Sequence, residues 1–169
     1  MSDLHDLWAA ARTFIQTKFE TLILVPSPNE QEAVIPDSLS CGSAACVWYG
    51  ITGYNPMGQQ APEEQNRDRN SQLEKDINSL NSSIVVSIFP AFSEDPVGDW
   101  REYGFCVACS EEIDEVLIGL GRKYEQGAIY KYTINSSGRL VQSVVSCFEE
   151  MKSTESDVIM QVIIDTKAN

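Results

Sequence analysis

The sequence contains a single histidine, His5, which lies close to the N-terminus. A Ser-His-Asp or Cys-His set therefore cannot be built from the middle of the chain, and catalysis by histidine is not expected. A phosphate-binding glycine loop followed by lysine is also missing, since Gly119-x-Gly121 falls inside a helical pattern. These absences disfavour histidine-based enzymes, histidine-rich metal sites and phosphate-binding loops.

Basic residues are scarce. The chain has 12 Lys and Arg against 25 Asp and Glu, which gives a net charge of −13. Such a surface repels nucleic-acid phosphates, so we expect no direct nucleic-acid binding. Two interpretations stay open, a solvated acidic surface or a decoy that occupies the basic groove of a protein partner. The acids form small clusters rather than one long acidic helix, which weakens the decoy interpretation.

Long apolar runs are missing too. No run approaches the roughly 18 residues that a membrane-spanning helix needs, so we expect no membrane association. Residues 1–7 hold two acids and neither Lys nor Arg, which is unlike the start of a signal peptide. The sequence therefore predicts a cytoplasmic protein, or one whose targeting segment is already missing.

The five cysteines are an odd number, and without a signal peptide they do not predict a disulfide framework. Cys106-x-x-Cys109 lies on a predicted strand, where residues three apart point to opposite faces. The two thiols therefore cannot easily bind one metal ion, and we interpret both cysteines as small buried residues. A four-thiolate zinc site that adds Cys41 and Cys46 is the alternative. We expect neither a metal nor a cofactor.

The length and composition indicate one domain. A chain of 169 residues fits the usual size of a single domain, and 43% hydrophobic residues is close to a globular average. We divide residues 1–169 into three parts without a domain boundary. They are an N-terminal helix and loop at 1–45, a core at 46–134 and a C-terminal extension of strands at 135–169.

The apolar spacing predicts the elements. A helix is expected over 3–19 and a strand over 21–25, followed by a loop over 27–42. The core elements are expected in the order strand (46–54), helix (62–80), strand (84–89), strand (100–109), helix (from Ser110 onwards) and strand (128–134). A loop is expected at 91–99. Further strands are expected over 140–148 and 158–165. The order β-α-β-β-α-β predicts an α+β, ferredoxin-like sandwich with an antiparallel sheet and two helices on one face.

The helix predicted over 62–80 has a polar interruption. Its apolar face runs through Leu73 and Ile77, and the same spacing continued backwards meets Asn70 and Asn66. A buried amide without a partner costs about 1–3 kcal/mol, so these two side chains need hydrogen bonds. They either brace the strand end at 54–56 or help to line a polar pocket.

Four short stretches resemble a known family. They are Ile51-Thr-Gly-Tyr-Asn-Pro56, Asn66-x-x-x-Asn70-x-x-Leu73, Trp100-Arg-Glu-Tyr-Gly-Phe105 and Tyr124-Glu-Gln-Gly-Ala-Ile129. In this order and spacing, over about residues 51–130, the chain resembles the uncharacterised bacterial domain-of-unknown-function 3293 family. Tyr54 stands where that family usually has a tryptophan. The resemblance implies no activity, but it points to Asn55, Asn66, Asn70, Trp100, Glu102 and Gln126.

These six residues fit one site in the predicted fold. All but Gln126 gather at one edge of the sheet, and Gln126 lies at that edge or the opposite one. An aromatic wall, a carboxylate and several amides suit a small polar ligand. We therefore predict a small binding or regulatory domain. The alternatives are an acidic interaction or decoy protein with a basic partner, a homodimer formed through the sheet, and an enzyme that uses Glu102 as a general base.

Overall fold

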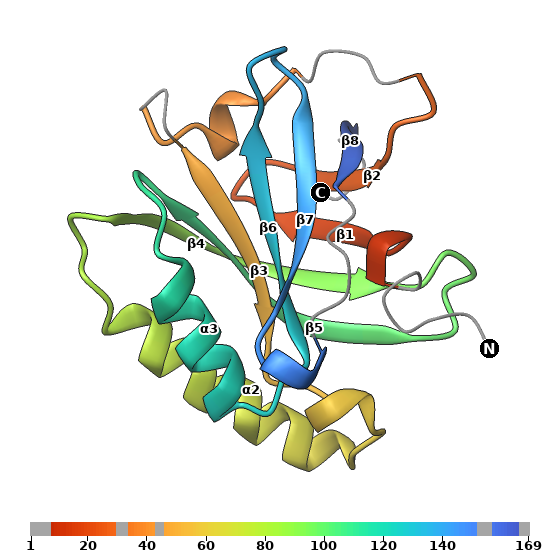
Figure 1. Ribbon diagram of the computed structural model, residues 1–169, viewed down its shortest axis with the longest axis vertical. Coiled ribbons are helices and arrows are strands. Elements are labelled where there is room, and N and C mark those ends of the chain that lie inside the picture. Colours follow the sequence, from red (N-terminus) through yellow and green to blue (C-terminus); the bar gives the residue numbers. More distant parts are fainter. Residues whose placement is uncertain (1–7, 30–33, 43–45, 152–156, 166–169) are drawn as a thin grey trace.

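The chain folds into a closed barrel of antiparallel strands with helices packed on its outside (Figure 1). This computed structural model describes residues 8–29, 34–42, 46–151 and 157–165. Within them the strands and helices are β1 (Arg12–Gln16), β2 (Thr21–Pro26), β3 (Val47–Thr52), α2 (Glu63–Asn78), β4 (Val85–Glu94), β5 (Arg101–Cys109), α3 (Asp114–Lys123), β6 (Ala128–Ile134), β7 (Leu140–Ser146) and β8 (Val158–Asp165). The strands are hydrogen-bonded in the order β1-β2-β8-β7-β6-β3-β5-β4, and β4 pairs with β1 to close the wall.

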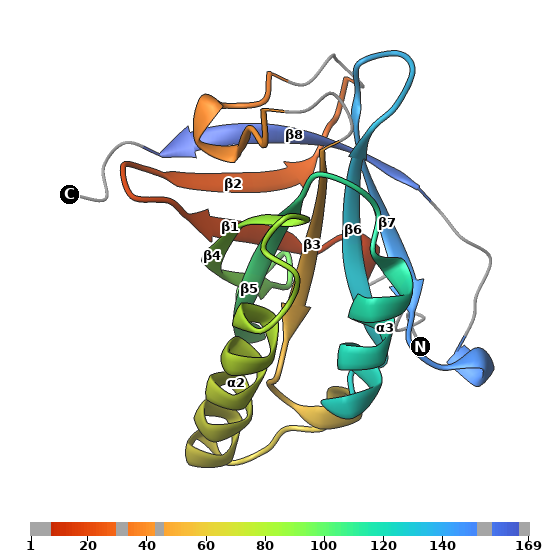
Figure 2. The ribbon, with the colours of Figure 1, turned by 90° about the vertical axis from the view of Figure 1, so that its left-hand side faces the viewer.

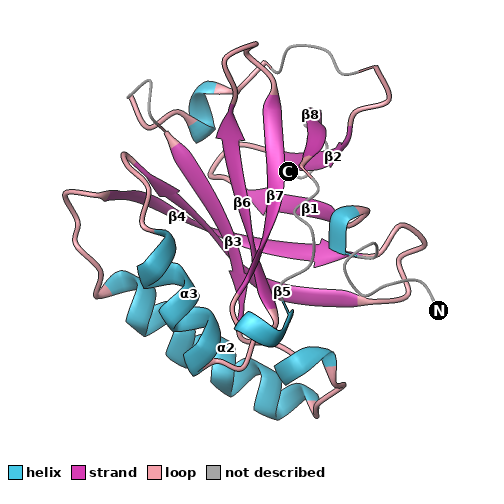
Figure 3. Cartoon of the chain, viewed as in Figure 1, coloured by secondary structure: helices cyan, strands magenta, loops and turns pink. Residues whose placement is uncertain are grey.

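The predicted ferredoxin-like α+β sandwich is wrong, because the sheet does not stop at four strands. β6, β3, β5 and β4 do lie side by side, and α2 and α3 pack on one side of them (Figure 2). Both outer strands of this group then gain a further partner, since β4 pairs with β1 and β6 pairs with β7. β2 and β8 complete the circle, so the strands expected as an extension form the missing wall (Figure 3).

The helix predicted over 3–19 is wrong over residues 12–16, which form β1, whereas residues 8–9 are helical and residues 3–7 lie outside the described residues. Thr13 and Ile15 face the barrel interior and are buried, whereas Phe14 stacks on Phe92 outside with 4.4 Å between ring centroids. This alternation has the period of a strand. β1 also extends its neighbour, because β4 continues to Glu94 through the stretch predicted as a loop.

Two cores share the wall. The outer core, between the wall and the helices, contains Val47, Tyr49, Ile51, Leu73, Ile77, Phe105, Val107, Cys109, Leu117, Tyr124, Ile129 and Cys147. The inner core, inside the barrel, contains Ile15, Leu22, Leu24, Leu39, Trp48, Ala91, Cys106, Ala108, Tyr132, Leu140 and Met160. Trp48 donates its indole N–H to the carbonyl oxygen of Leu39 at 2.9 Å, inside that core. The inner core fills one half of the barrel and leaves the other half for a cavity.

The cysteines differ in part from expectation. Cys41 and Cys46 form a disulfide, which the odd cysteine count did not predict. Cys106 belongs to the inner core and Cys109 to the outer core, so the two thiols lie on opposite faces of β5 as expected. The four-thiolate alternative is therefore wrong. Among the described residues, no helix is long and apolar enough to cross a membrane.

Candidate functional site

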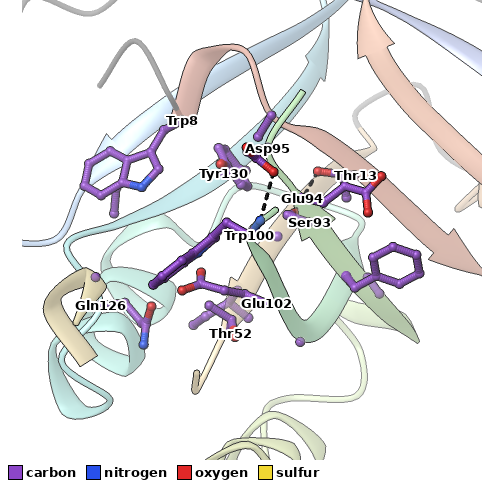
Figure 4. A pocket seen from close by; sticks show the side chains of 18 of the residues that line it. Trp8, Thr13, Thr52, Ser93, Glu94, Asp95, Trp100, Glu102, Gln126 and Tyr130 are labelled. Atoms are coloured by element: carbon purple, nitrogen blue, oxygen red, sulfur yellow. Dashed lines mark hydrogen bonds between the residues drawn. The ribbon is translucent and has the colours of Figure 1, made fainter. Parts of the chain in front are cut away.

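A cavity of about 360 Å³ opens at the end of the barrel that the inner core leaves free (Figure 4). Its walls come from β1, β3, β4, β5 and β6. Small residues stand at the inward positions here, with Gly50 on β3, Ala91 on β4 and Gly104 on β5. The next inward positions on β3 and β5, deeper in the barrel, are Trp48 and Cys106, which belong to the inner core. The change from larger to smaller inward side chains therefore creates the cavity.

Glu102 places a carboxylate inside this pocket. It is an inward residue of β5, and its Cα pairs with that of Ser93 on β4. Burial raises the pKa of Glu102 to about 6, while hydrogen bonds from the side chains of Asn55 and Trp100 act in the opposite direction. Figure 4 shows the carboxylate beside the Trp100 indole. Among the ion pairs of the described residues, none includes Glu102, so the pocket holds a carboxylate without a counter-ion from its wall.

Asn55 is the direct partner of Glu102. Its Nδ2 donates to Glu102 Oε1 at 3.1 Å, and its Oδ1 accepts from the Ala61 backbone N–H at 3.1 Å. Asn66 completes the arrangement, because its Oδ1 accepts from the Asn55 N–H at 2.8 Å and its Nδ2 donates to Asn55 Oδ1 at 3.0 Å. Since two donors occupy the Asn55 oxygen, its NH₂ group has to face Glu102. We call Asn55 and Asn66 the amide pair.

Further hydrogen bonds fix the loops around the amide pair. Asn70 Oδ1 accepts from the Gly53 N–H at 3.1 Å. Gln126 Nε2 donates to the carbonyl oxygens of Tyr54 at 2.8 Å and Tyr124 at 3.2 Å. Arg69 donates to the Gly53 carbonyl oxygen at 3.1 Å. The loop after β3 and the loop before β6 are thereby joined to each other and to α2.

The structure brings all six residues of the predicted site to one end of the barrel. Trp100, Glu102 and Gln126 line the pocket. Asn55, Asn66 and Asn70 lie behind them, and the last two direct their hydrogen bonds to the backbone of the loop after β3. Among the described residues, no group of three or more His, Cys, Asp or Glu is placed to hold a metal ion. The pocket therefore offers a carboxylate, an indole and an amide to a ligand.

The sequence analysis missed the part of the site that lies on β1, β4 and β6. Thr13 shares hydrogen bonds with the Ser93 hydroxyl at 3.0 Å and the Tyr132 hydroxyl at 2.9 Å, and the first of these is drawn in Figure 4. Tyr130 and Trp8 line the same cavity. The alternation within residues 12–16 and 89–93 was the signal for β1 and β4, and a helical interpretation of the first and a loop in the second concealed it.

Glu102→Gln is expected to stabilise the protein at neutral pH. The folded state holds a proton on Glu102 up to about pH 6, against a pKa of 4.5 for an unperturbed carboxyl. Burial of the charge therefore lowers the free energy of unfolding as pH rises from about 4.5 to about 6, by at most about 2 kcal/mol at about 1.36 kcal/mol per pH unit. Glutamine carries no charge and still accepts a hydrogen bond from Asn55.

Urea denaturation of both proteins between pH 4 and pH 8 measures this effect. The advantage of Glu102→Gln should be near zero below about pH 4.5 and complete above about pH 6. Asp99→Asn removes the same charge from an exposed position and should change the free energy of unfolding little at any pH. A constant difference between Glu102→Gln and wild type across this range would contradict a buried carboxylate.

The part of the chain that resembles a known family forms one side of this pocket. A family model described as "Protein of unknown function (DUF3293)" matches residues 51–129. No curated protein and no solved structure gives a significant match. The matched range starts in β3 and ends in β6, so it contains the amide pair, Trp100, Glu102 and Gln126 but not β1, β2, β7 or β8. The resemblance expected from the sequence is confirmed over these residues, and the family is one of uncharacterised function.

Proposed function

We propose that this protein is a binding domain whose small-molecule ligand occupies the barrel pocket. The observation that carries the proposal is the cavity of about 360 Å³ with the Glu102 carboxylate inside it. Ligand sites commonly measure about 300–1,000 Å³ and combine apolar walls with a few placed polar groups. A barrel of eight strands is also wide enough to hold one small ligand.

Backbone strain beside the pocket supports a preformed site. Asn55, Met57 and Glu125 have left-handed φ values of 47°, 52° and 54°. Such conformations cost about 1–3 kcal/mol each and persist where the surrounding structure fixes them. The Met57 N–H donates to the Glu125 carbonyl oxygen at 2.6 Å, and the amide pair fixes Asn55. Rigid loops of this kind lower the entropy that a ligand loses on binding.

Ala128→Trp is expected to abolish binding. Ala128 lines the pocket, and an indole at this position would fill the cavity. A fragment library containing cationic, neutral and anionic members is screened by two-dimensional NMR on the wild-type protein. Binding fragments should shift the signals of the Trp100 indole N–H and the Gln126 side-chain amide, and Ala128→Trp should remove these shifts.

Val86→Trp is the matched control, because it introduces the same side chain at an exposed position of β4 outside the pocket. It should leave fragment binding unchanged. Fragments that shift signals only away from Trp100 and Gln126, or that bind Ala128→Trp as well as wild type, would contradict the proposal.

General-base catalysis by Glu102 is the second candidate. It is favoured by the pKa of about 6, which burial brings close to neutral pH, where a base is most effective. Both polar atoms of each member of the amide pair are engaged in hydrogen bonds, whereas the Glu102 carboxylate lines the pocket and can contact a substrate. Conversion of a bound fragment, lost in Glu102→Gln while binding persists, would support this candidate over binding alone.

A further inference from the structure

We infer that the ligand of this pocket is a small organic cation, an amine or amidine carrying an apolar group, whose charged nitrogen pairs with Glu102. This inference rests on the proposed binding function and names the chemical class of the ligand. It starts from the contrast between two carboxylates at the same end of the barrel.

Glu94 and Glu102 differ in their partners. Glu94 is buried at the end of β4, and both of its oxygens are neutralised, one by Arg12 at 2.8 Å and the other by Arg101 at 2.7 Å. Glu102, on the adjacent strand, receives a hydrogen bond from the neutral Asn55 amide and has no ion pair within the described residues. Glu102 is partly buried, and a carboxylate that is partly removed from water without a cation is costly, so such groups concentrate at functional sites. The missing positive charge at Glu102 is therefore assigned to the ligand.

The other residues that line the pocket also favour a positively charged ligand. The described residues that line the pocket include no Lys, Arg or His, and they include Asp95 besides Glu102, while the charge of Glu94 is compensated by Arg12 and Arg101. An anionic ligand would meet like charge without a compensating cation. A carboxylate has about four acceptor positions, and Asn55 and Trp100 use two of those on Glu102, so N–H donors of a ligand can take the other two.

Aromatic and small residues suit the apolar part of the ligand. Trp8 and Trp100 lie at the mouth of the pocket, with the Trp100 indole beside the carboxylate (Figure 4). The face of an indole attracts a cation within about 6 Å of its centre. The net charge of −13 also raises the concentration of cations close to the protein. Gly50 and Gly104 leave room below the carboxylate for a ring or a short alkyl chain.

The groups around Glu102 make one side chain responsible for the pH dependence. Asn55 from the loop after β3, Ser93 from β4 and Trp100 before β5 are neutral. The lining also holds two other carboxylates, Glu94, which is paired with Arg12 and Arg101, and Asp95, which accepts from the Trp100 backbone N–H. Tyr130 from β6 is titratable, and burial together with Glu102 raises its pKa far above the neutral range. Affinity for a cation should therefore decrease when Glu102 is protonated, below about pH 6.

Three probes of one shape and different charge test the inference. Isothermal titration calorimetry of the whole protein at pH 7.5 compares 2-phenylethylamine, 2-phenylethanol and phenylacetate. The amine is expected to bind at least about tenfold more tightly than the alcohol, and the acid should bind most weakly. Glu102→Gln should remove the advantage of the amine over the alcohol. Asp99→Asn makes the same change in charge outside the pocket and should preserve the advantage.

A second measurement needs no variant. For wild type, the affinity of the amine should fall about tenfold per pH unit below pH 6, while that of the alcohol stays constant. An alcohol or acid that binds as tightly as the amine, or an amine affinity that is constant between pH 7.5 and pH 5, would overturn the inference. If the alcohol or acid binds wild type in this way but does not bind Ala128→Trp, the inference about charge is wrong while the proposed function is still supported. Binding by none of the three probes would count against both.

Discussion

Gly104→Ala is expected to lower the free energy of unfolding by about 3 kcal/mol or more. A Cβ atom at Gly104 would stand 2.2 Å from the carbonyl oxygen of Ile51 and 2.9 Å from the Cα of Thr52. Both atoms belong to the backbone of β3, the strand that pairs with β5 at this point. The clash cannot be relieved by rotating a side chain, so β3 and β5 would have to separate and lose hydrogen bonds in the barrel wall.

Gly119→Ala is the control for this substitution. Gly119 lies in α3, and a Cβ atom there would meet nothing within 4 Å. Alanine inside a helix stabilises by about 0.5–1 kcal/mol relative to glycine, so this variant should unfold at a higher urea concentration than wild type. Urea denaturation followed by circular dichroism measures both variants. Equal midpoints for Gly104→Ala and wild type would show that the two strands are farther apart than described.

The same close approach of β3 and β5 shapes the pocket. Gly104 and Gly50 both line the cavity, where neither contributes a side chain. A Cβ at Gly50 would approach the Tyr130 side chain at 3.3 Å, which can shift slightly, whereas that at Gly104 meets backbone. Gly104 is therefore needed for the wall itself, and Gly50 chiefly for the volume enclosed.

The sequence was informative where elements carry a strong local pattern. β3, α2, β5 and β6 were predicted close to their observed positions, because each has continuous or periodic apolar residues bounded by turn residues. β1 was not, because Trp8, Ala11 and Ile15 also fall at helical spacing. Only pairing with β2 and β4 selects the strand. A five-residue segment has too little local preference to decide this by itself.

Closure of the barrel could not be predicted either, because it too depends on pairing between distant strands. Whether the β4 and β6 edges find partners depends on β1 and β7, which lie outside the predicted core in the sequence. The amide pair was partly visible, since Asn66 interrupts an apolar stripe and a polar interruption is a local signal. The approach of Thr13 to Ser93 depends on closure, and their hydroxyls could not be placed in one cavity beforehand.

Asn66→Ala is expected to lower the free energy of unfolding by about 3 kcal/mol, because it leaves buried polar groups unpaired. Asn66 is 4% exposed. Its oxygen accepts from the Asn55 backbone N–H at 2.8 Å, and its nitrogen donates to Asn55 Oδ1 at 3.0 Å and to the Ala61 carbonyl oxygen at 3.3 Å. Alanine removes all three hydrogen bonds, and the cavity that it leaves is too confined for water to replace each of them in good geometry.

Asn78→Ala is the matched control for Asn66→Ala. The Asn78 side chain donates to the Glu74 carbonyl oxygen within the exposed last turn of α2, where water replaces it, so its loss should cost no more than about 0.5 kcal/mol. Thermal and urea denaturation measure both variants. The difference between them also bears on the pocket, because a loosened Asn55 no longer directs its NH₂ group to Glu102, and a folded Asn66→Ala protein should bind 2-phenylethylamine more weakly. Similar losses of stability in the two variants would mean that the amide pair does not fix the Asn55 loop, and the preformed site would then need another cause.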